Sequence, residues 1–127
     1  MSTYLDRYLA GEHERVWAEL VALGPAVRDE PIYTDARAVA QETMRRARRN
    51  IETLIPRLRE IGYQFGYDGI PVSEEERRHL APVFAPPAPK VAATMARLES
   101  QVGPLPLSLR AFYEVVGAVN LTGKHPH

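Results

Sequence analysis

One segment, from Asp35 to Ile61, carries the longest regular hydrophobic pattern in the chain. Its apolar residues recur at alternating spacings of four and three over three heptads, at Ala40, Met44, Ala47, Ile51, Leu54, Leu58 and Ile61. This spacing predicts a long amphipathic helix with one narrow buried face. Three heptads are few for a coiled coil between chains, so we expect the helix to pack against a second helix of the same chain.

The expected partner helix is the segment from Thr3 to Leu23, which has an apolar stripe of its own and stops before Gly24. Ser2 or Thr3 can cap its start, because a side-chain oxygen there accepts a hydrogen bond from a free backbone N–H. Gly11 is less favourable than alanine inside a helix by about 1 kcal/mol, so we expect a bend or break there. The two segments together predict an antiparallel helical hairpin.

Pro56 interrupts the pattern of the long helix. Proline has no backbone N–H, and its ring crowds the carbonyl group of Glu52, so it bends or ends a helix. The apolar spacing continues past Pro56 and favours one kinked helix. A second helix capped by Thr53 is the alternative that the sequence leaves open.

Residues 62–69 alternate aromatic residues with small or polar ones, at Tyr63, Phe65 and Tyr67. This alternation indicates a short strand or an extended aromatic loop. Aromatic clusters can stack on nucleic-acid bases, but such surfaces also carry basic residues, and none lies between these rings. The favoured interpretation is that the three rings cover the helix pair, which completes an N-terminal unit of residues 1–69.

Residues 70–90 form an acidic, proline-rich linker. Ser73 and Glu76 have the spacing of a capping box at the start of a short helix. Four prolines between Pro82 and Pro89 exclude a regular helix or a central strand in the second half of the linker. We therefore expect this part to be extended.

Residues 91–127 form a third unit, which begins with helices from Val91 to Val102 and from Pro106 to Val116. Gly117 can end the second helix, and the alternation from Ala118 to Thr122 predicts a half-buried strand. The sequence thus predicts a mainly α fold, an amphipathic helical hairpin plus two C-terminal helices, with one or two short strands. The expected core residues are Leu9, Trp17, Leu20, Met44, Ile51, Leu54, Leu58, Leu98, Leu109, Phe112 and Val116.

The stretch from Leu105 to Gly123 begins with a leucine–proline pair. A short predicted helix containing Leu-Arg-Ala-Phe-Tyr follows, and then a glycine before a predicted strand. This order resembles the opening motif of the SUKH superfamily, which includes bacterial toxin-immunity proteins and fungal cell-wall regulators. The resemblance implies a protein-binding module, and the N-terminal part of an α+β domain whose further strands follow the motif. The strand at 118–122 would otherwise pair with the aromatic segment or with a second chain, because a lone strand is marginal in water.

Composition excludes several classes of function. The 16 basic and 16 acidic residues cancel, so no overall field attracts nucleic acid or an anionic membrane. The chain has no cysteine, which excludes disulfides, thiolate metal sites and cysteine nucleophiles. Its N-terminus lacks the pattern of a signal peptide, and no apolar run approaches the roughly 20 residues that span a bilayer. We expect a cytoplasmic protein without a membrane segment.

Residues for catalysis or metal binding are sparse. Ser100 and Ser108 have no nucleophile-elbow context. His125 and His127 supply only two of the four ligands that a structural zinc site requires, and they read better as part of a frayed terminus. We expect no enzymatic activity, no cofactor and no metal.

The strongest charge feature is a run of arginines on the predicted long helix. Guanidinium groups bind carboxylates and phosphates, and they also solvate a helix face without any ligand. The leading hypothesis is a non-enzymatic protein-interaction module, immunity-like or regulatory, with an unidentified protein partner. The alternative is a small nucleic-acid-associated protein that uses the arginine-rich face. The candidate interaction surface comprises Arg45, Arg46, Arg48, Arg49, Tyr63, Phe65 and Tyr67.

Overall fold

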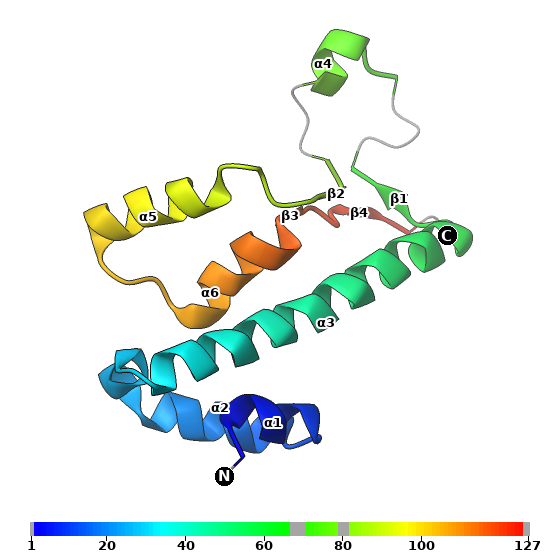
Figure 1. The fold of residues 1–127 in the computed structure, drawn as a ribbon. Helices are drawn as coiled ribbons and strands as arrows, with labels where there is room; N and C mark the ends of the chain where they lie inside the picture. Colours follow the sequence, from blue (N-terminus) through cyan, green and yellow to red (C-terminus); the bar gives the residue numbers. More distant parts are fainter. Residues whose placement is uncertain (1, 67–70, 79–81, 126–127) are drawn as a thin grey trace.

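The computed structural model describes residues 2–66, 71–78 and 82–125, and its fold is mainly helical, as the sequence predicts (Figure 1). The N-terminal part consists of two short helices, a 3-10 turn and one long helix. Their bounds are α1 (Tyr4–Leu9), α2 (His13–Ala22), η1 (Gly24–Arg28) and α3 (Ile32–Glu60). Within these described ranges, no helix is both long enough and apolar enough to cross a membrane.

The expected N-terminal helix is divided into α1 and α2 at Gly11, where φ is +106°. Thr3 caps α1 in a reciprocal arrangement with Asp6: the backbone N–H of Asp6 donates to Thr3 Oγ1 at 3.0 Å, and the backbone N–H of Thr3 donates to Asp6 Oδ2 at 3.1 Å. The Asp35 carboxylate on α3 accepts from the first two backbone N–H groups of α1, at 2.7 and 3.1 Å. The predicted break and cap are therefore confirmed, and a carboxylate from α3 holds the start of α1.

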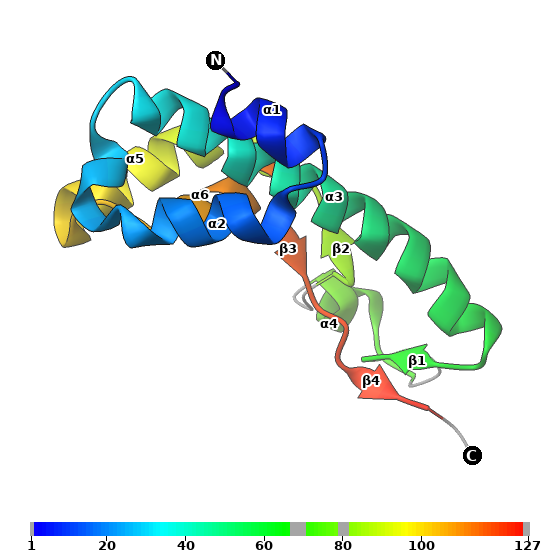
Figure 2. The same ribbon diagram turned by 90° about the horizontal axis from the view of Figure 1, so that it is seen from below.

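The helices α2 and α3 run antiparallel, as the sequence predicts. His13 contacts Arg46, and Trp17, further along α2, donates to Thr43, which lies earlier on α3. The core between the three helices contains five buried residues, Tyr8, Val16, Leu20, Ala36 and Val39. Figure 2 shows that α1 and α2 lie beside the first half of α3, while its second half continues toward β1 and β4.

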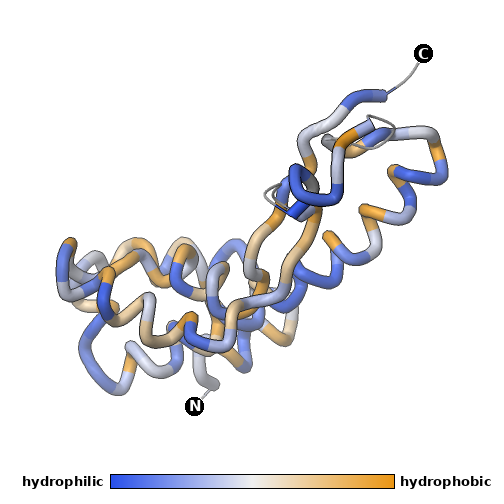
Figure 3. Tube along the Cα trace, turned by 90° about the horizontal axis from the view of Figure 1, so that it is seen from above, coloured by the Kyte–Doolittle hydropathy of each residue, from blue (hydrophilic) through white to orange (hydrophobic). Residues whose placement is uncertain are grey.

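α3 is continuous through Pro56, so a second helix capped by Thr53 does not form. Thr53 Oγ1 donates instead to the carbonyl oxygen of Arg49 at 2.9 Å. The predicted heptad seam is wrong in the second half of α3: Leu54 is 42% exposed, whereas its neighbour Ile55 is 8% exposed. The reason is that a different set of segments covers this half, so the buried face turns away from the side that faces α1 and α2. Polar and apolar residues mix along this half of α3 in Figure 3.

The C-terminal helices are α5 (Val91–Val102) and α6 (Leu107–Ala111), and α6 continues as a π-helical turn, η2 (Phe112–Val116). α6 and η2 pack on α3, α5 contacts η2, and Met95 of α5 is buried. Two ion pairs of Arg110, with Glu99 at 2.7 Å and with Glu114 at 3.1 Å, join α5 to α6 and η2. Of the expected core, Leu20 and Val116 are fully buried, while Leu9, Leu54 and Leu109 are exposed, which corrects the prediction for those three.

Two short antiparallel strand pairs close the fold: β1 (Gln64–Phe65) with β4 (Gly123–Lys124), and β2 (Phe84–Ala85) with β3 (Ala118–Val119). The aromatic segment is thus one strand partner, as expected, but its contact is with residues 123–124. The strand at 118–119 pairs instead with the proline-rich linker. Two residues fit between Pro82 and Pro86 as an edge strand, so the linker is part of the folded unit in this region.

Candidate functional site

The four arginines of the candidate surface do not share one environment. Arg46 turns toward α1 and α2: its Nη1 lies 3.0 Å from Nε2 of His13, and its guanidinium group lies 5.0 Å from the ring centroid of Tyr8. The His13 ring in turn packs against the Tyr8 ring in a tilted arrangement, with 4.6 Å between centroids. Arg46 therefore holds the hairpin together.

Arg48 joins three elements of the fold. Its Nη1 donates to the carbonyl oxygen of Val115 on η2 at 3.1 Å, and its Nε donates to Glu52 at 2.9 Å. Its guanidinium group also lies 5.7 Å from the ring centroid of Phe84 on β2. These contacts fix the direction of the Arg48 side chain.

Arg45 and Arg49 are exposed and less constrained. Arg45 Nε donates to Glu42 at 3.2 Å, and Arg49 Nη2 lies 3.9 Å from the same carboxylate. Glu42 also accepts from Arg46 at 3.2 Å, so one carboxylate serves three guanidinium groups. With Glu52 paired to Arg48, the four arginines face two carboxylates, which leaves an excess of two positive charges.

The aromatic part of the candidate surface lies at the other end of α3. Phe65 is 1% exposed and the Arg59 guanidinium group lies 5.0 Å from its ring centroid, so this ring is a core residue and not an exposed contact. Tyr63 packs edge-on against Phe65 at 4.9 Å, and its hydroxyl donates to the carbonyl oxygen of Leu121 at 2.7 Å. Tyr67 lies outside the described residues. The rings of Tyr63 and Phe65 thus cover the end of α3.

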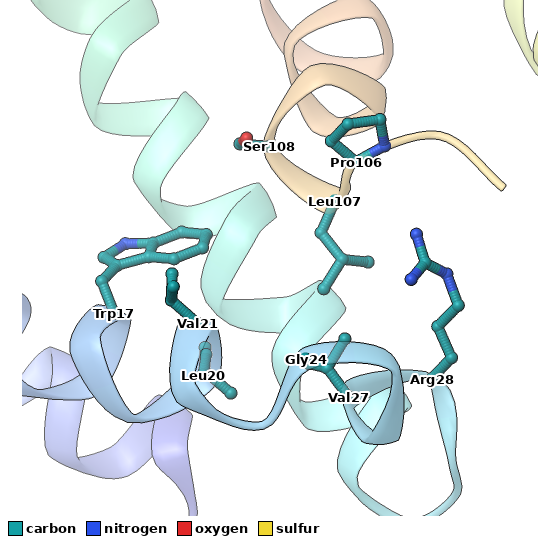
Figure 4. A pocket seen from close by; sticks show the side chains of 9 residues that line it. All are labelled: Trp17, Leu20, Val21, Gly24, Val27, Arg28, Pro106, Leu107 and Ser108. Carbon is teal, nitrogen blue, oxygen red and sulfur yellow. The ribbon is translucent and has the colours of Figure 1, made fainter.

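An apolar groove that the sequence does not indicate opens between α2, η1 and the start of α6, with a volume of about 240 Å³ (Figure 4). It forms because α6 packs on α3 and because Val16 and Leu20 of α2 also pack against α3, while η1 turns the chain between α2 and α3. This arrangement leaves a gap at the edges of the three elements. The nine described residues that line it are Trp17, Leu20, Val21, Gly24, Val27, Arg28, Pro106, Leu107 and Ser108.

Trp17 and Leu107 define the two walls of the groove (Figure 4). The indole Nε1 of Trp17 donates to Thr43 Oγ1 at 3.1 Å, so its polar atom is satisfied and the ring offers an apolar surface. Val21 is 74% exposed at the mouth. The arrangement can accept one large apolar side chain.

Arg28 is the charged member of the nine described lining residues. Its Nη2 donates to the carbonyl oxygen of Leu105 at 3.4 Å, which holds the guanidinium group at the rim beside Pro106. The hydrophobic pattern of Thr3 to Leu23 includes Trp17 and Val21, but the groove depends on where η1 and α6 lie. A pattern within one helix carries no information on that placement.

A second charge cluster joins α1 to α2. The Arg7 guanidinium group binds Glu19 through two hydrogen bonds, of 2.7 and 2.9 Å. This hydrogen bonding lowers the pKa of the Glu19 carboxyl group, and the bonds to Glu19 and Glu12 raise the pKa of Arg7. In the described ranges, no group of three or more histidine, aspartate or glutamate side chains is arranged to hold a metal ion.

Comparison of the chain with protein-family models, with curated proteins and with solved structures finds no match. The two surface features that could bind a partner are the apolar groove and the arginine-rich face of α3.

Proposed function

We propose that the chain is a non-enzymatic protein-interaction module, and that the apolar groove is its binding site. The observation that carries this proposal is the combination of a tryptophan wall, held by its hydrogen bond to Thr43, with the highly exposed Val21 beside it. Binding energy at protein interfaces concentrates where an apolar or aromatic anchor enters such a pocket. The partner supplies that anchor.

Arg28 determines the second feature of the partner. A guanidinium group at the rim of an apolar pocket favours a carboxylate next to the anchor residue, because the two charges attract and can form a bidentate contact. We therefore expect a partner segment in which a large apolar residue is adjacent to an aspartate or glutamate.

The resemblance at Leu105 to Gly123 supports the same proposal, because Pro106, Leu107 and Ser108 of this stretch line the groove. A SUKH-like role, as an immunity-like or regulatory protein acting in the cytoplasm, is part of the proposal. Fractionation of cells that produce the full protein would test the location.

The test is selection from a random peptide display library on the purified chain, followed by affinity measurement of the enriched peptides. We expect enrichment of an aromatic or leucine residue next to an acidic one, and at least a tenfold loss of affinity, about 1.4 kcal/mol, for Val21→Asp. The matched control is Val102→Asp, because Val102 is a similarly exposed valine at 67%, on α5 outside the groove. No enrichment, or equal loss in both variants, would contradict the proposal.

Nucleic-acid binding through Arg45, Arg46, Arg48 and Arg49 is the second candidate, favoured by the exposed Arg45 and Arg49. Because Arg46 is turned toward His13 and Tyr8, we expect about three phosphate contacts, from Arg45, Arg48 and Arg49. Affinity should then fall about as the third power of salt concentration. Undetectable binding at low salt would remove this candidate.

A further inference from the structure

The arginine-rich face of α3 borders a pocket of about 430 Å³ at the contact between α3 and η2. Arg45, Arg48, Arg49 and Glu52 lie at positions i, i+3, i+4 and i+7, so they share one side of the helix. Glu114 and Val115 of η2 complete the lining. Three guanidinium groups therefore border one cavity.

The charges around this pocket do not cancel. Glu114 is already bound by Arg110 Nε at 3.1 Å, and Arg37 lies 3.6 Å from it on the other side. Glu52 is engaged with Arg48, and Arg45 and Arg49 share Glu42 with Arg46. The lining itself has three arginines and two glutamates, so its excess is one positive charge, and Arg37 and Arg110 pair with Glu114 from outside the lining.

Two of the guanidinium groups have donors to spare. Arg45 uses its Nε on Glu42, and Arg49 reaches that carboxylate only at 3.9 Å. Both side chains are exposed, whereas Arg48 is held by its hydrogen bond to the Val115 carbonyl group. One held guanidinium group with two exposed ones beside it can surround a small anion with hydrogen bonds.

The shape of the charge distribution favours a compact anion over a polymer. The next arginine along this side of α3, Arg59, lies over the ring of Phe65, and Glu52 stands between it and the pocket. A nucleic-acid backbone that followed the helix would meet this carboxylate. A terminal phosphate carries about two negative charges at neutral pH and has three terminal oxygens that guanidinium groups bind, and three guanidinium groups border this pocket.

We infer that this pocket binds the phosphate group of a small phosphate monoester. Arg48 provides the fixed contact, and Arg45 and Arg49 close over the phosphate oxygens. The site is separate from the apolar groove, and the inference does not depend on the proposed protein partner.

The test is calorimetric titration of the full chain with glycerol phosphate and with dimethyl phosphate, a singly charged diester, at matched ionic strength. We expect saturable binding of the monoester and at least tenfold weaker binding of the diester. Arg45→Ala and Arg49→Ala should each weaken monoester binding about tenfold. Glu52→Gln should strengthen it, because the variant removes a negative charge from the lining and releases Arg48 Nε.

Arg57→Ala is the matched control, because Arg57 is an exposed arginine of α3 outside the pocket lining, and Val21→Asp tests independence from the groove. Neither variant should change monoester binding. The inference is overturned if glycerol phosphate does not bind saturably, if the diester binds equally well, or if Arg57→Ala has the effect of Arg49→Ala. It is also overturned if a single-stranded oligonucleotide binds and glycerol phosphate cannot displace it.

Discussion

At the scale of single residues, Leu54 and Ile55 show how the burial of α3 differs from its periodicity. Ile55→Ala should lower the free energy of unfolding by about 2–4 kcal/mol, because it removes apolar volume from a site that is 8% exposed. Leu54→Ala should cost less than about 1 kcal/mol. Urea denaturation of both variants measures the difference. A larger loss of unfolding free energy for Leu54→Ala than for Ile55→Ala would indicate that the heptad face is the buried one.

Single residues also show what a sequence pattern can and cannot establish about the candidate sites. Four neighbouring arginines are visible in the sequence, but their roles differ because Arg46 meets His13 and Arg48 meets Val115. Both partners are distant in the chain, so only the folded arrangement separates the fixed arginines from Arg45 and Arg49.

At the scale of elements, the Arg7–Glu19 contact determines how the α1–α2 junction responds to acid. Because the fold lowers the pKa of Glu19, the stabilisation is present at neutral pH. It is lost as the pH falls through and below the ordinary pKa of a glutamate, about 4.3. Thermal unfolding at a series of pH values should show this loss.

Two variants on α2 test the assignment of that acid response. Glu19→Gln should flatten the dependence of the melting temperature on pH in the acidic range, since it removes the group whose pKa is lowered. Glu14→Gln, at an exposed position of the same helix, should leave the dependence unchanged. Equal flattening by both substitutions would argue against a specific role for the Arg7–Glu19 contact.

Elements defined by local rules follow the sequence closely. The capping box of Ser73 and Glu76 forms as predicted, with hydrogen bonds of 3.1 Å in both directions, and it starts α4 (Glu74–Arg78). The break between α1 and α2 at Gly11 also follows from a local rule, because glycine is unfavourable inside a helix. Strand pairing cannot be predicted from local rules in this way. The partner of Phe84 and Ala85 depends on how the whole chain folds.

At the scale of the whole molecule, Gly117 controls how the linker meets the C-terminal segment. Its φ is +94°, and a Cβ atom there would overlap the carbonyl oxygen of Ala85. Gly117→Ala should therefore cost about 2–4 kcal/mol, from backbone strain and from separation of β2 and β3. Chemical denaturation and NMR shifts of residues 84–85 measure the two effects.

Gly103 offers a matched control for Gly117. Its φ is also left-handed, at +90°, but a Cβ atom there would meet open space. Gly103→Ala should cost only the backbone strain, about 1–2 kcal/mol, and should leave the strand pair intact. If the two substitutions had equal effects, the close approach of Ala85 to Gly117 would have no energetic role.

The mainly helical fold can be predicted from the spacing of apolar residues, because that spacing indicates both the long helix and its antiparallel partner. The apolar groove and the arginine-lined pocket cannot be predicted from periodicity, because both lie where α6 or η2 meets the N-terminal helices. Leu107 and Trp17 approach the same groove from positions 90 residues apart. The sequence of neither segment indicates that it contacts the other.

The nesting of the two strand pairs has a consequence for the order of folding. β1 and β4 join residues 60 apart in the chain, and β2 and β3 join residues 35 apart inside that loop. Forming the inner pair first shortens the outer loop and lowers its closure cost by about 1 kcal/mol. The contacts of α1 and α2 with the first half of α3 are more local, so we expect the hairpin to fold early and the outer strand pair to close last.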